Sequence, residues 1–176
     1  MHDAVRNHDG RARFVNTGLP GFSGRAYGFN GANSYVSVRS ASDLNPRRKR
    51  IVMRLYLRTR SAPPKPDWDL MRKGLHTTPG GEYLMEYQPR GRASCAFKGS
   101  IRRAQVFARP RLDDGRWHSI KCIKTRSRIT VLVDGRRFSK PVRVGRIANA
   151  APVVIGARPG SEFFKGSLDE ASIEIG

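Results

Sequence analysis

Hydrophobic and polar residues alternate in short pieces along this chain, and turn-forming residues separate the pieces. In IVMRLYLRTR (51–60) the apolar side chains share one face, while Arg54, Tyr56 and Arg58 share the other. A strand with one apolar and one basic face belongs to a sheet that packs on one side and meets water on the other.

The same alternation predicts further strands, and no apolar stripe with helical spacing competes with it. RSAPPKPDWD (60–69) predicts a long surface loop instead, because its prolines cannot donate to a strand ladder. The pattern therefore predicts a single all-β domain over residues 1–176, built as a sandwich or barrel. The further strands are expected at 34–38, 82–87, 94–98, 104–108, 117–124, 128–134, 152–157 and 167–175.

Two Asp-Gly steps frame the most regular part of the pattern, LDDGRWHSIKCIKTRSRITVLVDGRRF (112–138). Asp114-Gly115 and Asp134-Gly135 predict tight turns, because glycine supplies the positive φ that such turns need. The two runs between the turns are expected to pair as a β-hairpin.

The net charge of the chain is +20, from 34 Lys and Arg against 14 Asp and Glu. Such a charge attracts polyanions, including nucleic acid, acidic glycans and anionic membrane surfaces. The arginines are scattered along the whole sequence, however, which is more typical of a solvated surface or a coding bias than of a dedicated site. No apolar run approaches the ~20 residues of a membrane span, and the chain does not open with a signal-peptide pattern.

The two cysteines, Cys95 and Cys122, are the smallest number that can form a disulfide. Their spacing fits no metal-binding motif. The pair alone leaves open whether they are bonded or are two buried thiols.

Three stretches, in this order, carry a family resemblance: GFSGRAYGFNGANSYVSV, LDDGRWHSIKC…TVLVDGRRF and APVVIGARPGSEFFKGSLDEASIEIG. They resemble the early, central and closing segments of laminin G-like, concanavalin A-like lectin/glucanase domains of the bacterial secreted type. The resemblance implies a jelly-roll sandwich of two antiparallel sheets, one of them often concave. It also implies a binding module that is usually extracellular or displayed on the cell surface.

The resemblance further implies a disulfide between Cys95 and Cys122, which needs an oxidising compartment. It implies a possible structural calcium ion, in which Asp169 would join the loop around Asn30 and Gly31. Calcium takes six to eight oxygen ligands, and Asp169 is the one strong ligand in this set.

Members of the family usually begin with a strand ahead of a segment such as HDAVRNHDG, with which this chain starts. The domain is therefore expected to lack its first strand or to be excised from a longer protein. If that strand is absent, its neighbour, the C-terminal strand 167–175, is expected to have an unpaired edge.

Candidate ligand contacts lie on the polar face of the 51–60 strand. An aromatic ring at Tyr56 between Arg54 and Arg58 suits an acidic sugar, because the ring can stack while guanidinium groups hold a carboxylate or phosphate. An ordinary solvated basic face is the simpler interpretation. Trp68 can either stack on a sugar or cap the edge of the core, and Tyr87 is a further aromatic candidate.

Trp117 and His118 follow the first Asp-Gly turn. Trp117 is expected to pack between the sheets and anchor the hairpin. His118 has no second histidine or cysteine placed to help it bind a metal, so we expect it to be a structural hydrogen-bonding group.

Catalysis is not expected. Jelly-roll glycosidases need two carboxylates facing the scissile bond, and the Glu-x-Asp-x-x-Glu strand of the hydrolase relatives is absent. Glu82 and Glu86, like Glu170 and Glu174, stand about 13 Å apart along a strand. The serines and histidines show no nucleophile arrangement either.

The sequence therefore predicts a non-catalytic module that binds carbohydrate outside the cell, with a preference for acidic polysaccharides or surface glycans. One alternative is a structural or adhesive protein-interaction domain whose partners are other domains of a larger surface protein. Another is a non-specific polyanion or nucleic-acid binder, whose affinity would collapse as salt rises.

Overall fold

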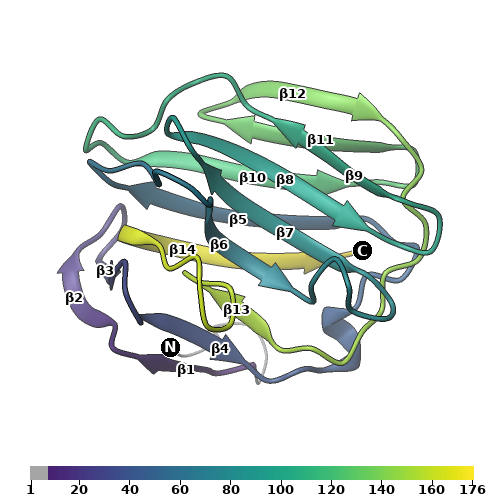
Figure 1. Ribbon diagram of the computed structural model, residues 1–176, viewed down its shortest axis with the longest axis horizontal. Helices are drawn as coiled ribbons and strands as arrows, with labels where there is room; N and C mark the ends of the chain where they lie inside the picture. Colours follow the sequence, from purple (N-terminus) through teal and green to yellow (C-terminus); the bar gives the residue numbers. More distant parts are fainter. Residues whose placement is uncertain (1–7) are drawn as a thin grey trace.

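Strand alternation along residues 8–176, the part of the chain that the computed structural model describes, builds two seven-stranded antiparallel sheets packed face to face (Figure 1). We call the sheet nearer the viewer in Figure 1 the front sheet and the other the back sheet. In spatial order, the front sheet holds β1 (Gly10–Arg13), β4 (Tyr35–Val38), β13 (Val153–Ile155), β6 (Trp68–Lys73), β7 (Glu82–Gln88), β8 (Arg92–Lys98) and β9 (Arg103–Phe107). The back sheet holds β12 (Arg136–Pro141), β11 (Arg128–Val133), β10 (His118–Lys124), β5 (Ile51–Arg58), β14 (Lys165–Ile175), β3 (Arg25–Asn30) and β2 (Asn16–Pro20).

The core lies between the sheets and follows the predicted alternation. Met53, Leu55 and Leu57 of β5 are fully buried, and the residues between them are partly exposed on the outer face of the back sheet. Tyr83 and Met85 of β7 close the core from the front sheet. The all-β sandwich expected from the sequence is therefore confirmed.

The hairpin predicted between the two Asp-Gly steps is also confirmed. β10 pairs with β11 in antiparallel register, with Ile120 opposite Val133. Asp134 and Gly135 both have positive φ, 48° and 79°, and return the chain into β12. This conformation is typical of a tight hairpin turn, for which glycine has no steric cost.

A disulfide joins Cys95 to Cys122, as the family resemblance implied. Cys95 lies on β8 of the front sheet and Cys122 on β10 of the back sheet, and both are fully buried. The bond therefore crosses the core and ties the two layers of the sandwich together.

Several strands were not predicted, and one predicted loop is too long. The 60–69 loop ends at residue 67, because Trp68 and Asp69 already pair with β7 as the start of β6. The strands absent from the prediction are β1, β2, β3, β6 and β12.

The expected unpaired edge at the C-terminal strand is found over part of its length. β14 pairs with β5 along one side from Ser167 to Ile175, and with β3 along the other side over Lys165–Leu168, so among the described strands its 169–175 part pairs on one side. Helical structure in the described chain is a single 3-10 turn, Ser42–Leu44, and none of the described residues forms a helix long and apolar enough to span a membrane.

Candidate functional site

The outer face of the back sheet brings aromatic rings and arginines together. Arg54, Tyr56 and Arg58 point outward from β5, as the alternation predicted. The Tyr56 ring stacks on Phe22, with 3.8 Å between centroids and 11° between planes. Phe22 is 51% exposed, so its outer surface, rather than that of Tyr56, is open to a ligand.

A short loop holds Phe22 over Tyr56. The Ser23 amide donates to Asp169 Oδ2 at 3.0 Å, and Asp169 stands opposite Tyr56 in the ladder between β14 and β5. Gly21 starts this loop, and a Cβ there would lie 2.6 Å from Asp169 Oδ2. The carboxylate of Asp169 and the missing side chain of Gly21 therefore fix the position of the exposed ring.

Arg58 is held next to this ring pair by two contacts. Its Cζ lies 4.7 Å from the centroid of the Trp117 ring, and its Nη2 donates to the Pro20 carbonyl at 3.2 Å. A guanidinium over an indole face is attracted by the ring quadrupole, more strongly as water is excluded. Both contacts restrict the rotamers of Arg58 while most of its donors stay available.

Trp117 does not pack between the sheets, so that expectation is wrong. It is partly exposed just before β10, and its ring contacts Arg58 on the outer face. The reason is the alternation itself: Ile120 and Cys122 point into the core, which places position 117 on the opposite face.

A cavity of about 400 Å³ opens beside Arg58 at the end of the sandwich. Arg58, Arg60 and Lys165 contribute three cations to its wall, and its described lining contains no carboxylate. The cavity can therefore take an anionic group against several donors, one of which already lies on an aromatic ring. The remaining lining residues are Thr59, Ser61, Gly115 and Gly166.

His118 connects the two Asp-Gly turns close to this surface. Its Nε2 lies 2.9 Å from Asp114 Oδ1 and its Nδ1 lies 2.7 Å from Asp134 Oδ2. Partial burial lowers the pKa of His118, but the hydrogen bonds to Asp134 and Asp114 outweigh burial and raise it above the ordinary value. His118 thus has the structural hydrogen-bonding geometry that we expected.

Trp68 and Tyr87 lie away from this surface. Trp68 packs against Tyr87 and Phe164, with ring centroids 6.1 Å and 5.9 Å away, and so caps the edge of the core. Tyr87 is fully buried, which makes it unsuitable as a ligand contact. Of the five ligand candidates, the structure brings together Arg54, Tyr56 and Arg58.

The calcium set expected from the resemblance is not brought together. Asn30 stands opposite Lys165 in the ladder between β3 and β14, four positions from Asp169, or about 13 Å at the usual strand rise. Asn30 Oδ1 already accepts from the amides of the 32–34 turn, and both Asp169 oxygens accept backbone amides. Gly31 has a positive φ of 78° and forms the turn itself. These residues do not fit a calcium ion.

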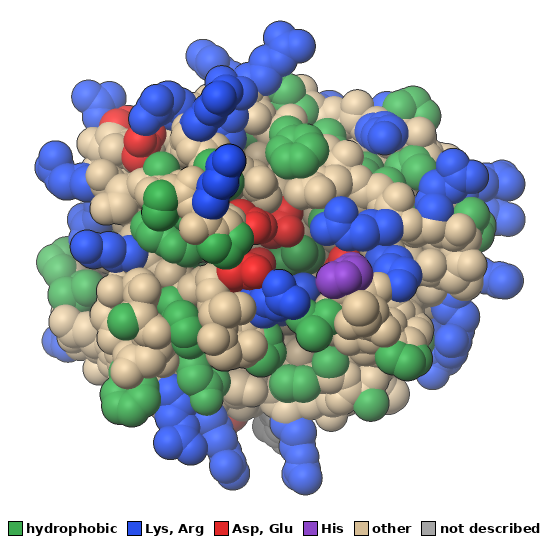
Figure 2. Space-filling model, in the orientation of Figure 1, with side chains coloured by type: hydrophobic (Ala, Val, Ile, Leu, Met, Phe, Trp, Pro, Cys, Tyr) green, Lys and Arg blue, Asp and Glu red, His purple; other side chains and the backbone are tan. Residues whose placement is uncertain are grey.

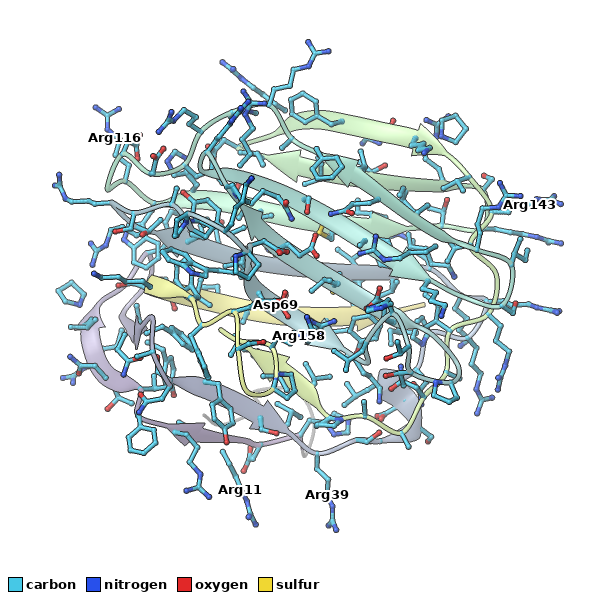
Figure 3. The ribbon with its side chains drawn as sticks, viewed as in Figure 1. Arg11, Arg39, Asp69, Arg116, Arg143 and Arg158 are labelled. Atoms are coloured by element: carbon cyan, nitrogen blue, oxygen red, sulfur yellow. A yellow bond between two sulfur atoms is a disulfide. The ribbon has the colours of Figure 1, made fainter. Side chains whose placement is uncertain are left out.

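The outer face of the front sheet has the opposite charge at its centre. Figure 2 shows acidic side chains gathered near the middle of this face, with arginines and lysines around the margin. In Figure 3, Asp69 lies centrally beside Arg158, while Arg11, Arg39, Arg116 and Arg143 project outward.

Two carboxyl groups on this face have strongly raised pKa values. Burial raises the pKa of Asp69 to about 7 with a smaller contribution from the carboxylate of Glu162, although the attraction of Arg72 lowers it. Burial raises the pKa of Glu86 to about 8, although the hydrogen bond from Ser94 lowers it.

Sequence reasoning missed Phe22, Arg60 and Lys165 on the back face, and the acidic group on the front face. Phe22 and Lys165 sit on segments that were not predicted as strands or ligand loops. The sequence did hold one signal for the front face. Asp69 stands between the apolar residues Trp68 and Leu70, and a charged residue that is buried among apolar neighbours needs a polar or charged partner.

Comparison with known proteins places this geometry in a family. Residues 30–174 match the family model described as the concanavalin A-like lectin/glucanases superfamily. A search of curated proteins found no match.

Several solved structures share the fold at low sequence identity. One of them is domain 4 of AbnA, a GH43 extracellular arabinanase from Geobacillus stearothermophilus, solved in complex with arabinotriose. It is 16% identical to this chain, with a TM-score of 0.72, and the match covers 99% of this chain and 86% of that domain. Domains LG4-5 of the mouse laminin alpha1 chain are 18% identical, with a TM-score of 0.69, covering 85% of this chain and 40% of that one.

The binding domain of Paraclostridial Mosquitocidal Protein 1 is 15% identical, with a TM-score of 0.72, and covers 95% of this chain and 44% of that one. The chain therefore spans less than half the length of the laminin and mosquitocidal protein structures. With its two sheets and the family match over most of its length, this chain belongs to the concanavalin A-like lectin/glucanases superfamily.

Proposed function

We propose that this domain is a non-catalytic module that binds acidic carbohydrate outside the cell. The observation that carries the proposal is the cavity lined by Arg58, Arg60 and Lys165. Arg58 lies two positions along β5 from Tyr56, on which the exposed ring of Phe22 stacks. Among the structural neighbours, domain 4 of AbnA was solved with arabinotriose and the binding domain of botulinum neurotoxin DC with SialylT.

The cations of the cavity and the ring of Phe22 would bind different parts of the sugar. Guanidinium groups at Arg58 and Arg60 can each hold a carboxylate or sulfate through two parallel hydrogen bonds. The face of Phe22 offers apolar area to the C–H side of a neighbouring sugar ring. An acidic oligosaccharide would therefore place its charged group in the cavity and its next ring over Phe22.

Binding without turnover fits the chemistry of this surface. Hydrolysis of a glycosidic bond needs two carboxyl groups across the bond, and the described lining of the cavity supplies none. Single sites of this kind are weak, so strength would come from tethering to a larger protein or from several copies.

The disulfide supports a place outside the cell. Bonds such as Cys95–Cys122 persist in oxidising surroundings and are rare in the cytosol. We therefore propose that the domain is secreted or displayed on the cell surface.

Two double variants with the same loss of charge test the proposal. Arg58→Ala with Arg60→Ala removes two cations from the cavity, and Arg11→Ala with Arg39→Ala removes two exposed cations that project elsewhere. Titration calorimetry with oligogalacturonate should show affinity reduced by at least about tenfold in the first variant and nearly unchanged in the second, because a charged hydrogen bond contributes about 1.5–3 kcal/mol.

General polyanion binding predicts another result. Both double variants would then weaken binding equally, and affinity would fall with salt to the same extent for oligogalacturonate, heparin and DNA. That outcome, or binding to none of these polymers, would contradict acidic-sugar recognition at the cavity.

A further inference from the structure

Three carboxylates from distant parts of the sequence meet on the outer face of the front sheet. Asp67 ends the loop before β6, Asp69 lies on β6, and Glu162 lies between β13 and β14. One oxygen from each lies within 4.8 Å of the other two. The Asp69 amide donates to the Glu162 carbonyl at 3.1 Å, which fixes the two segments side by side.

Asp69 carries the second, independent observation. Its side chain has no exposed surface, and its Oδ2 accepts a short hydrogen bond from Arg72 Nη1. Its Oδ1 is buried and has no hydrogen-bond partner among the described residues. A buried carboxylate oxygen without a partner costs about 1–3 kcal/mol or more, so such atoms are normally met by an ion or another polar group.

The neighbouring cations do not neutralise the group. Arg72 divides its donors between Asp69 and Glu82, and Arg158 bonds Glu162 at 2.8 Å. Asp67 receives a 3.3 Å hydrogen bond from the neutral amide of Gln88. Two guanidinium groups therefore face three carboxyl groups, so the cluster carries one net negative charge when all three are ionised, in a protein whose net charge is +20.

The three oxygens are close enough together to bind one ion. Calcium binds oxygen at about 2.3–2.6 Å, so two of its ligands can stand up to about 5 Å apart, and the three oxygens all lie within 4.8 Å of one another. Calcium also accepts a flexible coordination geometry, whereas magnesium demands a near-ideal octahedron at about 2.1 Å. Three hard oxygen donors with water access at Asp67 and Glu162, both partly exposed, therefore suit calcium.

We propose that Asp67, Asp69 and Glu162 bind a calcium ion on the outer face of the front sheet. Water completes the coordination, and Asp69 Oδ1 gains the partner that it otherwise lacks. The site lies on the opposite sheet from the proposed sugar surface, so it stands whether or not that surface binds carbohydrate.

Isothermal titration of the chelator-treated full chain with CaCl₂ tests the site, with Asp67→Asn and Asp69→Asn as variants. Glu174→Gln is the matched control, because Glu174 is 72% exposed on the back sheet and pairs with Arg50. We expect calcium to bind the wild type, each ligand variant to bind at least about tenfold more weakly, and the control to match the wild type.

Asp67 lies at the end of a loop and is partly exposed, so we expect Asp67→Asn to fold. If Asp69→Asn does not fold, the calcium affinity of Asp67→Asn tests the proposal. Absence of binding to the wild type up to about 10 mM Ca²⁺, beyond the range of weak extracellular sites, would overturn the proposal. So would wild-type affinity in both ligand variants, or a loss of binding in Asp169→Asn instead.

Discussion

At the scale of single residues, three side chains hold positions that other residue types could not fill. His118 bridges two turn aspartates, Asp169 secures the Phe22 loop, and Arg58 lies against an indole ring. Each of the three contacts a residue that is distant in the sequence but close in space. Their roles follow from hydrogen-bond geometry and charge.

His118 should stabilise the domain more in acid than in base. Its raised pKa means that the folded state binds its proton more tightly, so the stabilisation is full below the unfolded pKa near 6.5 and is lost as pH rises through the folded value. His118→Gln should cost about 1–2 kcal/mol of unfolding free energy at pH 5.5 and less at pH 9. Urea unfolding at the two pH values measures this.

Replacing the exposed His76 by Gln gives the control, which should leave stability nearly unchanged at both pH values. A His118→Gln effect that is equal in acid and base would show that the two aspartates do not stabilise the charged ring.

Glu86 should make the folded protein less stable at high pH, in the same direction as His118. A carboxyl whose folded pKa is raised to about 8 stabilises the protein while protonated, and that contribution is lost as pH rises from about 4.5 through 8. Glu86→Gln keeps an acceptor for Ser94 without the buried charge, so it should raise stability by about 1 kcal/mol or more at pH 9.

The measurement is thermal or urea unfolding from pH 5 to 9. Glu174→Gln serves again as the exposed control. If Glu86→Gln follows the wild-type pH dependence throughout, the carboxyl is ionised in the folded protein and the inferred direction is wrong.

At the scale of elements, sequence alternation identified strands with one apolar face and missed those without. β5 alternates strictly and was predicted, whereas β2 and β12 lie at the edges of the back sheet and are largely exposed. β6 has a register shift between Asp69 and Met71 and buries charged residues on its outer face, so its pattern is irregular.

The candidate site was predictable only in part, for the same reason. Arg54, Tyr56 and Arg58 share a strand face, and that could be inferred from period-two spacing. Phe22 and Lys165 come close to this strand face because β14 lies between β5 and β3 in the back sheet. This strand order cannot be inferred from the spacing of residues within a single strand.

The disulfide should contribute most among the links between elements. It closes a loop with a sequence separation of 27 and joins the front sheet to the back sheet. Replacing both Cys95 and Cys122 by Ala should reduce the free energy of unfolding by about 3.5 kcal/mol, from the larger entropy of the unlinked unfolded chain. Guanidinium unfolding of both forms measures the loss, and a change below about 1 kcal/mol would contradict this view of the bond.

At the scale of the whole molecule, charge divides the sandwich into two unlike faces. The back sheet presents arginines and lysines with aromatic rings, and the front sheet has carboxylates at its centre within a basic margin (Figure 2). The net charge of +20 therefore gives long-range attraction for anions, while local geometry decides where they bind.

The most direct test of sugar binding at the back face uses the two tryptophans of the chain as reporters. Trp117 contacts Arg58 at the proposed surface, whereas Trp68 packs against the core edge beside the front sheet. Their indole N–H signals in a ¹H–¹⁵N NMR spectrum can be followed during titration with a short oligogalacturonate, with a neutral oligosaccharide of equal length as control. We predict that the Trp117 signal shifts with the acidic sugar and that Trp68 stays in place; a shift confined to Trp68, or equal shifts with both sugars, would contradict the account.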